Sequence, residues 1–190
     1  MEEVAAAAGR DPLEFRRALM QKHPKHLAVL NAAADKAGWG KPLPAGVHRG
    51  IAQFKGYGSY IAAVAEVSVK GDEVKVHRLV LGTNCGYAVN PDQIAAQVEG
   101  SVAYAFDTLQ SQSTVANGRM VNTNFDSYPI ARLRQMPRIE TVIAPTYDFW
   151  GGVGEPTICV VAPAILNAIF AATGKPMRNM PLKNHGLRIV

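Results

Sequence analysis

The feature that most constrains the fold is a change in hydrophobic period at residues 39–46. Before this segment, apolar residues such as Leu27 and Leu30 recur at helical spacing. After it, over residues 60–69 and 73–81, apolar and polar residues alternate as they do along a half-buried strand. The segment itself is rich in glycine and proline, which interrupt regular structure. The chain must therefore form both helices and a sheet, and residues 39–46 are the best candidate boundary between them.

The segment before the boundary is expected to be helical over residues 2–36. Asp11-Pro12 supplies a capping side chain followed by proline at the first helical position. A second helix is expected to follow His23-Pro24 and to end at Gly38. We therefore predict an N-terminal helical segment over residues 1–40 and an α+β region over residues 47–190.

The second region is expected to form a mainly antiparallel sheet packed against helices. Gly71-Asp72 separates two alternating runs, which indicates a hairpin. The fold class predicted from these signals is α+β, with the sheet packed against the helix that holds Gln97 and with the N-terminal helices as a separate layer. Turn and capping residues beside apolar runs predict the remaining elements. We expect a helix from Asn90-Pro91-Asp92 to about Tyr104 and a hairpin that joins 111–115 and 119–122. A strand over 139–144 and a helix over 162–172 closed by Gly174 are expected to follow.

Composition and charge exclude several classes of protein. The chain has 190 residues and a formal net charge of +5, but its lysines and arginines are scattered without aromatic interleaving, so no nucleic-acid partner is expected. Cys85 and Cys159 lack the spacing of a metal site or a disulfide framework and are expected to be small packed residues. No secretion signal is recognised at the start of the sequence, and the localisation is left open.

The most informative short segment is Gly151-Gly152-Val153-Gly154-Glu155-Pro156. Its glycines allow the backbone to approach a ligand closely, and Pro156 favours an extended conformation at Glu155. The segment is neither a phosphate-binding Walker loop nor a dinucleotide fingerprint. Taken alone, it fits a tight turn with an exposed glutamate better than it fits a catalytic loop.

The order of motifs along the chain resembles the C-terminal region of the large subunit of molybdenum hydroxylases, the xanthine dehydrogenase and aldehyde oxidase family. The similarity is greatest to the branch that contains the beta chains of isoquinoline 1-oxidoreductases and nicotinate or aldehyde dehydrogenases. It extends over about residues 2–182 and rests on these segments in order: Asn84-Cys85-Gly86, Val89-Asn90-Pro91-Asp92, Gln97-Val98-Glu99-Gly100, Asn124-Phe125, Tyr128-Pro129, Gly152-Val153-Gly154-Glu155-Pro156 and Ala162-Pro163-Ala164.

This resemblance implies roles for individual residues. Glu155 would be the catalytic base that takes a proton from the oxygen nucleophile. Gln97 would bind the cofactor through its amide, although a polar residue on a helix can equally be solvated or capping. Gly152 and Gly154 would let the backbone fit beneath the cofactor, and Gly100 is expected to permit close helix packing. No side chain of the chain is predicted to ligate a metal.

The resemblance also implies a cofactor and partners. They are molybdenum held by molybdopterin in its cytosine dinucleotide form, the remainder of the molybdenum-binding subunit, a small subunit with [2Fe-2S] clusters, a cytochrome c subunit as a further candidate, and an aldehyde or N-heterocycle as substrate. The isolated chain is expected to be inactive. The alternative is a non-catalytic split or truncated module that serves assembly.

Two departures from the family pattern bear on these roles. Asn84 stands where relatives usually have aspartate, which alters a buried charge interaction. Thr157-Ile158-Cys159 replaces glycine and prolines, which alters how the loop is braced.

Overall fold

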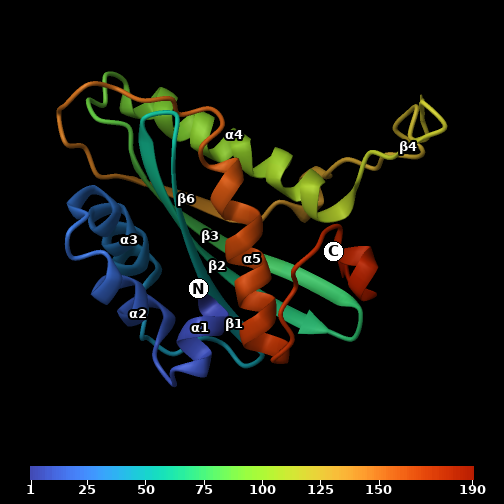
Figure 1. Ribbon diagram of the computed structural model, residues 1–190, viewed down its shortest axis with the longest axis horizontal. Coiled ribbons are helices and arrows are strands. Elements are labelled where there is room, and N and C mark those ends of the chain that lie inside the picture. The colour runs from blue at the N-terminus through green and yellow to red at the C-terminus, as the bar shows by residue number, and fades with distance from the viewer.

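The computed structural model, which describes residues 1–190, places a five-stranded sheet between two layers of helices (Figure 1). Three helices precede the first strand, and two longer helices lie between the later strands of the sheet in the chain. The regular elements are α1 (Glu2–Ala7), α2 (Pro12–Leu19), α3 (Pro24–Ala37), β1 (Val47–Gly56), β2 (Ser59–Lys70), β3 (Glu73–Asn84), α4 (Pro91–Gln110), β4 (Val115–Ala116), β5 (Arg119–Met120), β6 (Arg138–Ile143), α5 (Ile158–Thr173) and β7 (Arg188–Ile189), with short 3₁₀ turns at Leu133–Gln135 and Leu182–His185.

The main sheet has the order β1-β2-β3-β6. The first three strands pair antiparallel along nearly their full length. Lys55 of β1 lies opposite Tyr60 of β2, and Lys70 of β2 lies opposite Glu73 of β3. β6 and the short β7 both pair parallel with β3, at different ends of that strand. The fold is therefore α+β with a mainly antiparallel sheet, which confirms the predicted class.

Alternation along the strands divides the apolar side chains between two cores. Ile61, Ala63 and Ala65 of β2 belong to a large core with α4 and α5, whereas Ala62 and Val64 belong to a smaller core with α3. All five are fully buried. Successive side chains of a strand point to opposite faces, so both faces of β2 are covered and the strand is apolar throughout its middle.

The helix lying directly on β1 and β2 is α5, and α4 lies beside it over β6. A Cβ placed on Gly50 would lie 2.2 Å from the Ala168 nitrogen, so this strand and α5 approach so closely that only glycine fits. Asn167 Nδ2 also donates to the Ile51 carbonyl at 2.8 Å. The sheet does share a core with the helix that holds Gln97, but α5 provides most of the direct cover.

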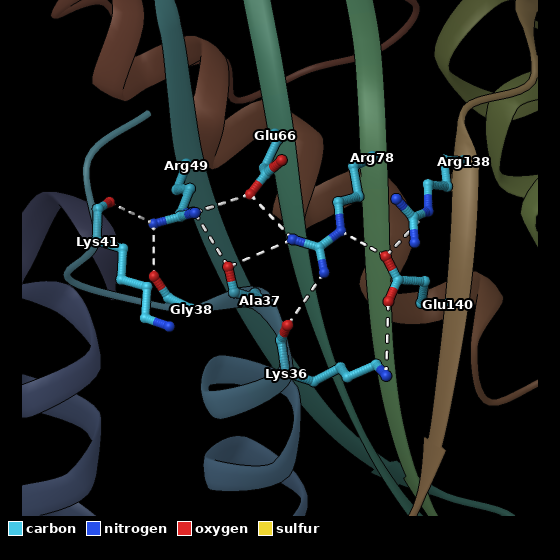
Figure 2. A network of polar contacts seen from close by, with 9 residues as sticks. All are labelled: Lys36, Ala37, Gly38, Lys41, Arg49, Glu66, Arg78, Arg138 and Glu140. Atoms are coloured by element: carbon cyan, nitrogen blue, oxygen red, sulfur yellow. Dashed lines mark hydrogen bonds and ion pairs between the residues drawn. The ribbon is translucent and has the colours of Figure 1, made fainter. Parts of the chain in front are cut away.

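The C-terminal end of α3 is fixed to the opposite face by two arginines (Figure 2). Arg49 and Arg78 both donate to the Glu66 carboxylate, and Arg78 also pairs with Glu140 at 2.7 Å. The guanidinium groups also donate to the last carbonyls of α3 and the turn that follows, those of Lys36, Ala37, Gly38 and Lys41. These carbonyls lack partners within the helix and carry its negative dipole end, so the arginines hold α3 by its C-terminus. We call Arg49, Glu66, Arg78 and Glu140 the arginine network.

Several local predictions are confirmed. The Asp11 carboxylate accepts from the amides of Leu13 and Glu14 at 2.9 and 3.0 Å, and the Asn90 side chain caps α4 at the Gln93 amide. The predicted hairpin around Asn117-Gly118 is present, with both residues at positive φ, but its strands have only two residues each. It projects from the body of the molecule at the upper right of Figure 1.

Three element boundaries differ from the sequence prediction. β1 was not predicted, because glycines and polar residues interrupt its alternation. α4 continues to Gln110 rather than Tyr104, since Phe106 and Leu109 extend its buried face. α5 begins at Ile158 rather than Ala162, because Pro163 lies inside the helix instead of at its start. That proline removes a single backbone hydrogen bond, which the remaining turns tolerate.

Candidate functional site

The glycine-rich loop is anchored by backbone hydrogen bonds to the end of the sheet. The Gly151 amide donates to the Cys85 carbonyl just beyond β3, and the Gly152 amide donates to the Tyr57 carbonyl in the β1–β2 turn, each at 2.8 Å. Two different parts of the sheet therefore set the position of the loop that leads to Glu155.

Steric crowding explains why glycine is needed at residue 151. A Cβ at this position would lie 2.4 Å from Ser59 Oγ and 2.6 Å from the Gly58 carbonyl carbon. The Ser59 hydroxyl is fully buried and donates to the Gly152 carbonyl at 2.6 Å. The loop thus lies directly on the β1–β2 turn, with no room for a side chain between them.

The other side of the loop is held by α4. Ser101 Oγ lies 2.5 Å from the Gly154 carbonyl and 2.8 Å from the Gln97 carbonyl one helical turn earlier. A Cβ on Gly154 would lie 3.5 Å from Gln97 Oε1, so the loop backbone passes close to that amide. The structure therefore brings together two segments that are more than fifty residues apart in the sequence.

A cavity of about 480 Å³ opens between α4 and this loop. The side chains of Gln97 and Glu155 are both exposed and form no hydrogen bond or ion pair with the rest of the chain. We call this space the Glu155 cavity. Its lining consists of Ala96, Gln97, Gly100, Ser101, Tyr104, Gly154, Glu155 and Ile158.

Gly100 faces this cavity rather than another helix. A Cβ placed on it would meet no atom within 4 Å. The expectation that Gly100 permits close helix packing is therefore wrong, since the helix that packs on α4 lies on its other side. The glycine instead leaves this wall of the cavity without a side chain.

Gln97 also borders a second, more apolar hollow of about 320 Å³. Exposed aromatic side chains gather beside it on the loops, where Phe149 and Trp150 stack with ring centroids 4.8 Å apart. Val153 of the glycine-rich loop lies in its wall together with Cys85, Tyr87, Val89, Asn90, Gln93, Ile94, Trp150 and Gly151. Gln97 thus borders both the Glu155 cavity and a hollow lined in part by aromatic side chains.

Of the residues in which the chain departs from the family pattern, Asn84 and Thr157 are buried, whereas Ile158 is partly buried and Cys159 is exposed. Asn84 Oδ1 accepts from the Gly86 amide at 2.9 Å and from Thr146 Oγ1 at 3.3 Å, while its Nδ2 is buried without a partner. The Thr157 hydroxyl at the start of α5 is likewise buried and unpaired. Asn84 thus fixes the backbone at Gly86, and neither Asn84 nor Thr157 lines the Glu155 cavity, whereas Ile158 does.

The two cysteines differ in their environments. Cys85 is buried, and that burial raises the pKa of its thiol. Cys159 is exposed on the first turn of α5, so the expectation that it is a packed residue is wrong. The predicted helix began at Ala162, so the sequence did not indicate that Cys159 lies on a helix with its thiol exposed.

The structure separates the predicted site residues into two groups. Gln97, Gly154 and Glu155 line one cavity, whereas Gly152 lies against Tyr57 behind it. The two serines that fix the loop, Ser59 and Ser101, were not predicted. Ser101 follows Gln97 by one helical turn, which is the only sequence signal of its location. Ser59 gives no such signal, because its partner Gly152 is 93 positions away.

No group of three or more histidine, cysteine, aspartate or glutamate side chains is arranged to hold a metal ion. None of the helices combines the length and apolar character that a membrane crossing requires.

A family model described as the molybdopterin cofactor-binding domain matches residues 3–137. This is well over half of the chain, which therefore belongs to this family. The family resemblance predicted from the sequence motifs is confirmed. The matched residues include Gln97 and Ser101 but end before the glycine-rich loop, so the role of Glu155 stays a prediction.

Relatives from the predicted branch are similar over nearly the whole chain. The chain is 28% identical over 189 residues to the beta chain of isoquinoline 1-oxidoreductase of Brevundimonas diminuta, covering 96% of this chain and 24% of that one. It is 31% identical to a nicotinate dehydrogenase chain of Pseudomonas putida, covering 99% of this chain and 18% of the other. A membrane-bound aldehyde dehydrogenase of Gluconacetobacter polyoxogenes is 30% identical, with 96% and 26% covered. The chain thus spans about a quarter or less of the length of these relatives.

Solved structures show the same fold. A Cu,Mo-CO dehydrogenase aligns with a TM-score of 0.58 and 23% identity, over 65% of this chain and 17% of that chain. The aldehyde oxidoreductase of Desulfovibrio gigas aligns with a TM-score of 0.57 and 22% identity, over 65% and 14% of the two chains. At these identities the alignments establish the architecture alone.

Proposed function

We propose that this chain supplies the catalytic base and part of the cofactor site of a molybdopterin-dependent hydroxylase. Glu155 is the base, Gln97 contacts the cofactor, and Gly152 and Gly154 shape the loop beneath it. The observation that carries the proposal is the Glu155 cavity, in which two side chains from distant segments face one space and are bound to nothing else in the chain.

The residues of the cavity suit a large polar cofactor. The Gln97 amide offers both donors and an acceptor, which matches the edge of a pterin ring. Gly100 and Gly154 leave walls without side chains, and a Cβ at Gly100 would fill space that is now open. When bound, molybdopterin in its cytosine dinucleotide form would supply the redox chemistry through its molybdenum.

In this proposal Glu155 acts as a general base on the oxygen nucleophile derived from water. A carboxylate can accept that proton while the oxygen attacks an electron-poor carbon of an aldehyde or N-heterocycle. The glycine-rich loop is held at the Gly151 and Gly152 amides and at the Gly154 carbonyl. These contacts fix the backbone on one side of Glu155 and leave its carboxylate free, which suits a group that must exchange protons.

The completed enzyme requires other protein. The chain covers 24% of the isoquinoline 1-oxidoreductase chain and 18% of the nicotinate dehydrogenase chain to which it is similar. We propose that the remainder of the molybdenum-binding subunit completes the site, with a small [2Fe-2S] subunit and a cytochrome c subunit as candidate electron acceptors. The isolated chain should therefore contain no molybdenum and should oxidise neither aldehydes nor N-heterocycles.

The test uses Glu155→Gln in the completed, cofactor-loaded enzyme. The amide keeps the size of the side chain but cannot accept the proton, so reduction of the enzyme by substrate should slow by about 100-fold or more. The measurement is the anaerobic reductive half-reaction, with molybdenum content determined on the same sample. Reduction at the wild-type rate with full molybdenum content would show that Glu155 is not the base.

Two matched variants separate the roles. Asp92→Asn makes the same carboxylate-to-amide change on α4 outside the cavity and should leave the rate unchanged. Gln97→Leu should lower the molybdenum content, which Glu155→Gln should not. A complex that retains no molybdenum even in the wild type would favour the alternative, a non-catalytic module that serves assembly.

A further inference from the structure

A cavity of about 420 Å³ lies between the start of α3 and the β1–β2 hairpin, apart from the Glu155 cavity. Neither Glu155 nor Gln97 borders it. We call it the α3 cavity. Basic side chains dominate its lining, which consists of Lys22, His23, Pro24, Lys25, His26, Lys55 and Tyr60.

The lysines of the α3 cavity converge from two elements. Lys55 Nζ lies 5.2 Å from the centroid of the Tyr60 ring, and Lys25 Nζ lies 5.8 Å from it. Lys22 and Lys55 take part in no ion pair, whereas Lys25 pairs with Asp148 at the edge of the cavity. Asp148 is thus the one carboxylate bound to these lysines, and the cavity keeps an excess of positive charge.

The backbone adds to this positive character. α3 has 14 residues, and its capping residue His23 makes no side-chain hydrogen bond to the first turn. The amides of a first helical turn have no acceptor within the helix, and they carry the positive end of its dipole. Because Pro24 has no N–H and the His23 and Leu27 amides are bonded, the free donors of this turn are the amides of Lys25 and His26.

His26 contributes an unpaired ring nitrogen. Its Nδ1 is buried and has no hydrogen-bond partner, while its ring packs edge-on against Tyr60 with centroids 4.8 Å apart. Burial lowers the pKa of His26, and the neighbouring His23 and Lys55 lower it further. A buried polar atom without a partner costs free energy, so packing against Tyr60, rather than a hydrogen bond at Nδ1, holds the ring in place.

We propose that the α3 cavity binds a phosphate group, either as inorganic phosphate or as the phosphate of a small phosphorylated molecule. Several lysines from different directions, together with free helix amides, suit a compact dianion with many acceptor oxygens. The Tyr60 ring is already in contact with Lys25, Lys55 and His26. Tyr60 is the one aromatic side chain other than histidine in the lining, and the proposed recognition is of the phosphate group by the lysines and the helix amides.

Calorimetric titration of the chain at low ionic strength tests the proposal, with inorganic phosphate and adenosine monophosphate as separate ligands. If only the phosphate group is recognised, both ligands should bind with one-to-one stoichiometry. If the cavity excludes a larger molecule, inorganic phosphate should bind and adenosine monophosphate should not. Binding of the nucleotide without binding of inorganic phosphate would overturn the proposal, as would binding of neither.

A charge-removing variant and its control locate the site. Lys55→Met keeps the alkyl chain and should weaken phosphate binding by about tenfold. Lys70→Met removes the same charge from an exposed residue of β2, about 33 Å along the strand from Tyr60, and should have no effect. Equal affinities in the two variants would show that binding reflects net charge rather than this cavity.

A variant that should bind phosphate more tightly distinguishes a change in the site from a loss of folding. Asp148→Asn removes the carboxylate that occupies Lys25, so phosphate should bind about threefold more tightly. A damaged fold cannot produce such a gain. Unchanged or weaker binding in Asp148→Asn would contradict the assignment of Lys25 to the phosphate site.

Discussion

The arginine network and the glycine-rich loop hold their segments by opposite means. In the network, charged side chains of β1, β2, β3 and β6 are bound to one another and to the end of α3, and the Arg49 and Glu66 side chains are only 12% and 11% exposed (Figure 2). In the loop, backbone atoms make the contacts, through the amides of Gly151 and Gly152 and the carbonyl of Gly154. The side chain that we propose as the base, Glu155, is left unbound.

This difference indicates which charges are structural and which are available for chemistry. A carboxylate that accepts from two arginines is committed, because releasing it would leave buried positive charge behind. A carboxylate on a loop held by its backbone can gain or lose a proton without loosening the loop. A conspicuous charge cluster is therefore a weaker sign of function here than a free side chain on a rigid backbone.

The largest effect is expected from breaking the network at its centre. Glu66→Gln removes the charge between Arg49 and Arg78, so the free energy of unfolding should fall by about 3 kcal/mol. Urea denaturation measures this directly. Glu73→Gln breaks an exposed pair with Arg188 and should cost less than about 0.5 kcal/mol. Similar losses in both variants would show that the network is no more than a set of surface ion pairs.

Two glycine substitutions should have effects of opposite sign. Gly151→Ala forces a Cβ against Ser59 and the Gly58 backbone, so it should destabilise the chain by about 2 kcal/mol and displace the loop. Gly100→Ala adds a methyl group to an exposed helical position with no atom nearby, so it should stabilise the chain by about 0.5 to 1 kcal/mol. Thermal unfolding of both variants measures these changes.

The Gly100→Ala variant also tests the proposed position of the cofactor. If the open wall at Gly100 receives the cofactor, Gly100→Ala should lower the molybdenum content of the completed enzyme although it stabilises the fold. A stabilised variant with unchanged molybdenum content would place the cofactor elsewhere in the Glu155 cavity.

The smallest expected effect is on how the free energy of unfolding changes at acidic pH. The hydrogen bond from Arg78 holds the pKa of Glu140 below its ordinary value of 4.5. A lowered folded-state pKa means that this stabilisation is complete well above pH 4.5 and is lost as pH falls through the folded-state pKa. Glu140→Gln should therefore be less stable than wild type at neutral pH, and the difference should shrink below about pH 4.5. A difference that is constant from pH 7 to pH 3 would contradict this.

Local signals allowed much of the fold to be predicted from the sequence. Caps at Asp11 and Asn90 act within three residues of themselves. The pattern along 60–69 correctly predicted a strand, but β2 is buried on both faces rather than on one. β1 was missed because its place in the sheet depends on pairing with β2 and on Gly50 lying beneath α5. These contacts depend on β2 and α5, so the sequence of β1 itself does not reveal them.

The candidate site shows the same division between local and distant information. Glu155 could be proposed because it lies within a short motif, and Gln97 because the order of motifs resembled a family. The residues that hold the loop, Ser59 and Ser101, lie 93 and 53 positions from the carbonyls they contact. Neither occurs in a pattern that distinguishes it from a surface serine, so only the three-dimensional structure could identify them.

The projecting hairpin of β4 and β5 offers a place to lengthen or label this protein. All residues of its two strands are exposed, and its hydrogen bonds are confined to neighbouring residues. Exposed turns of this kind accept inserted sequence because no core contact depends on them. A peptide tag or fluorophore inserted at Asn117-Gly118 would report on assembly with other subunits from a point well away from both cavities, without altering the residues that line them.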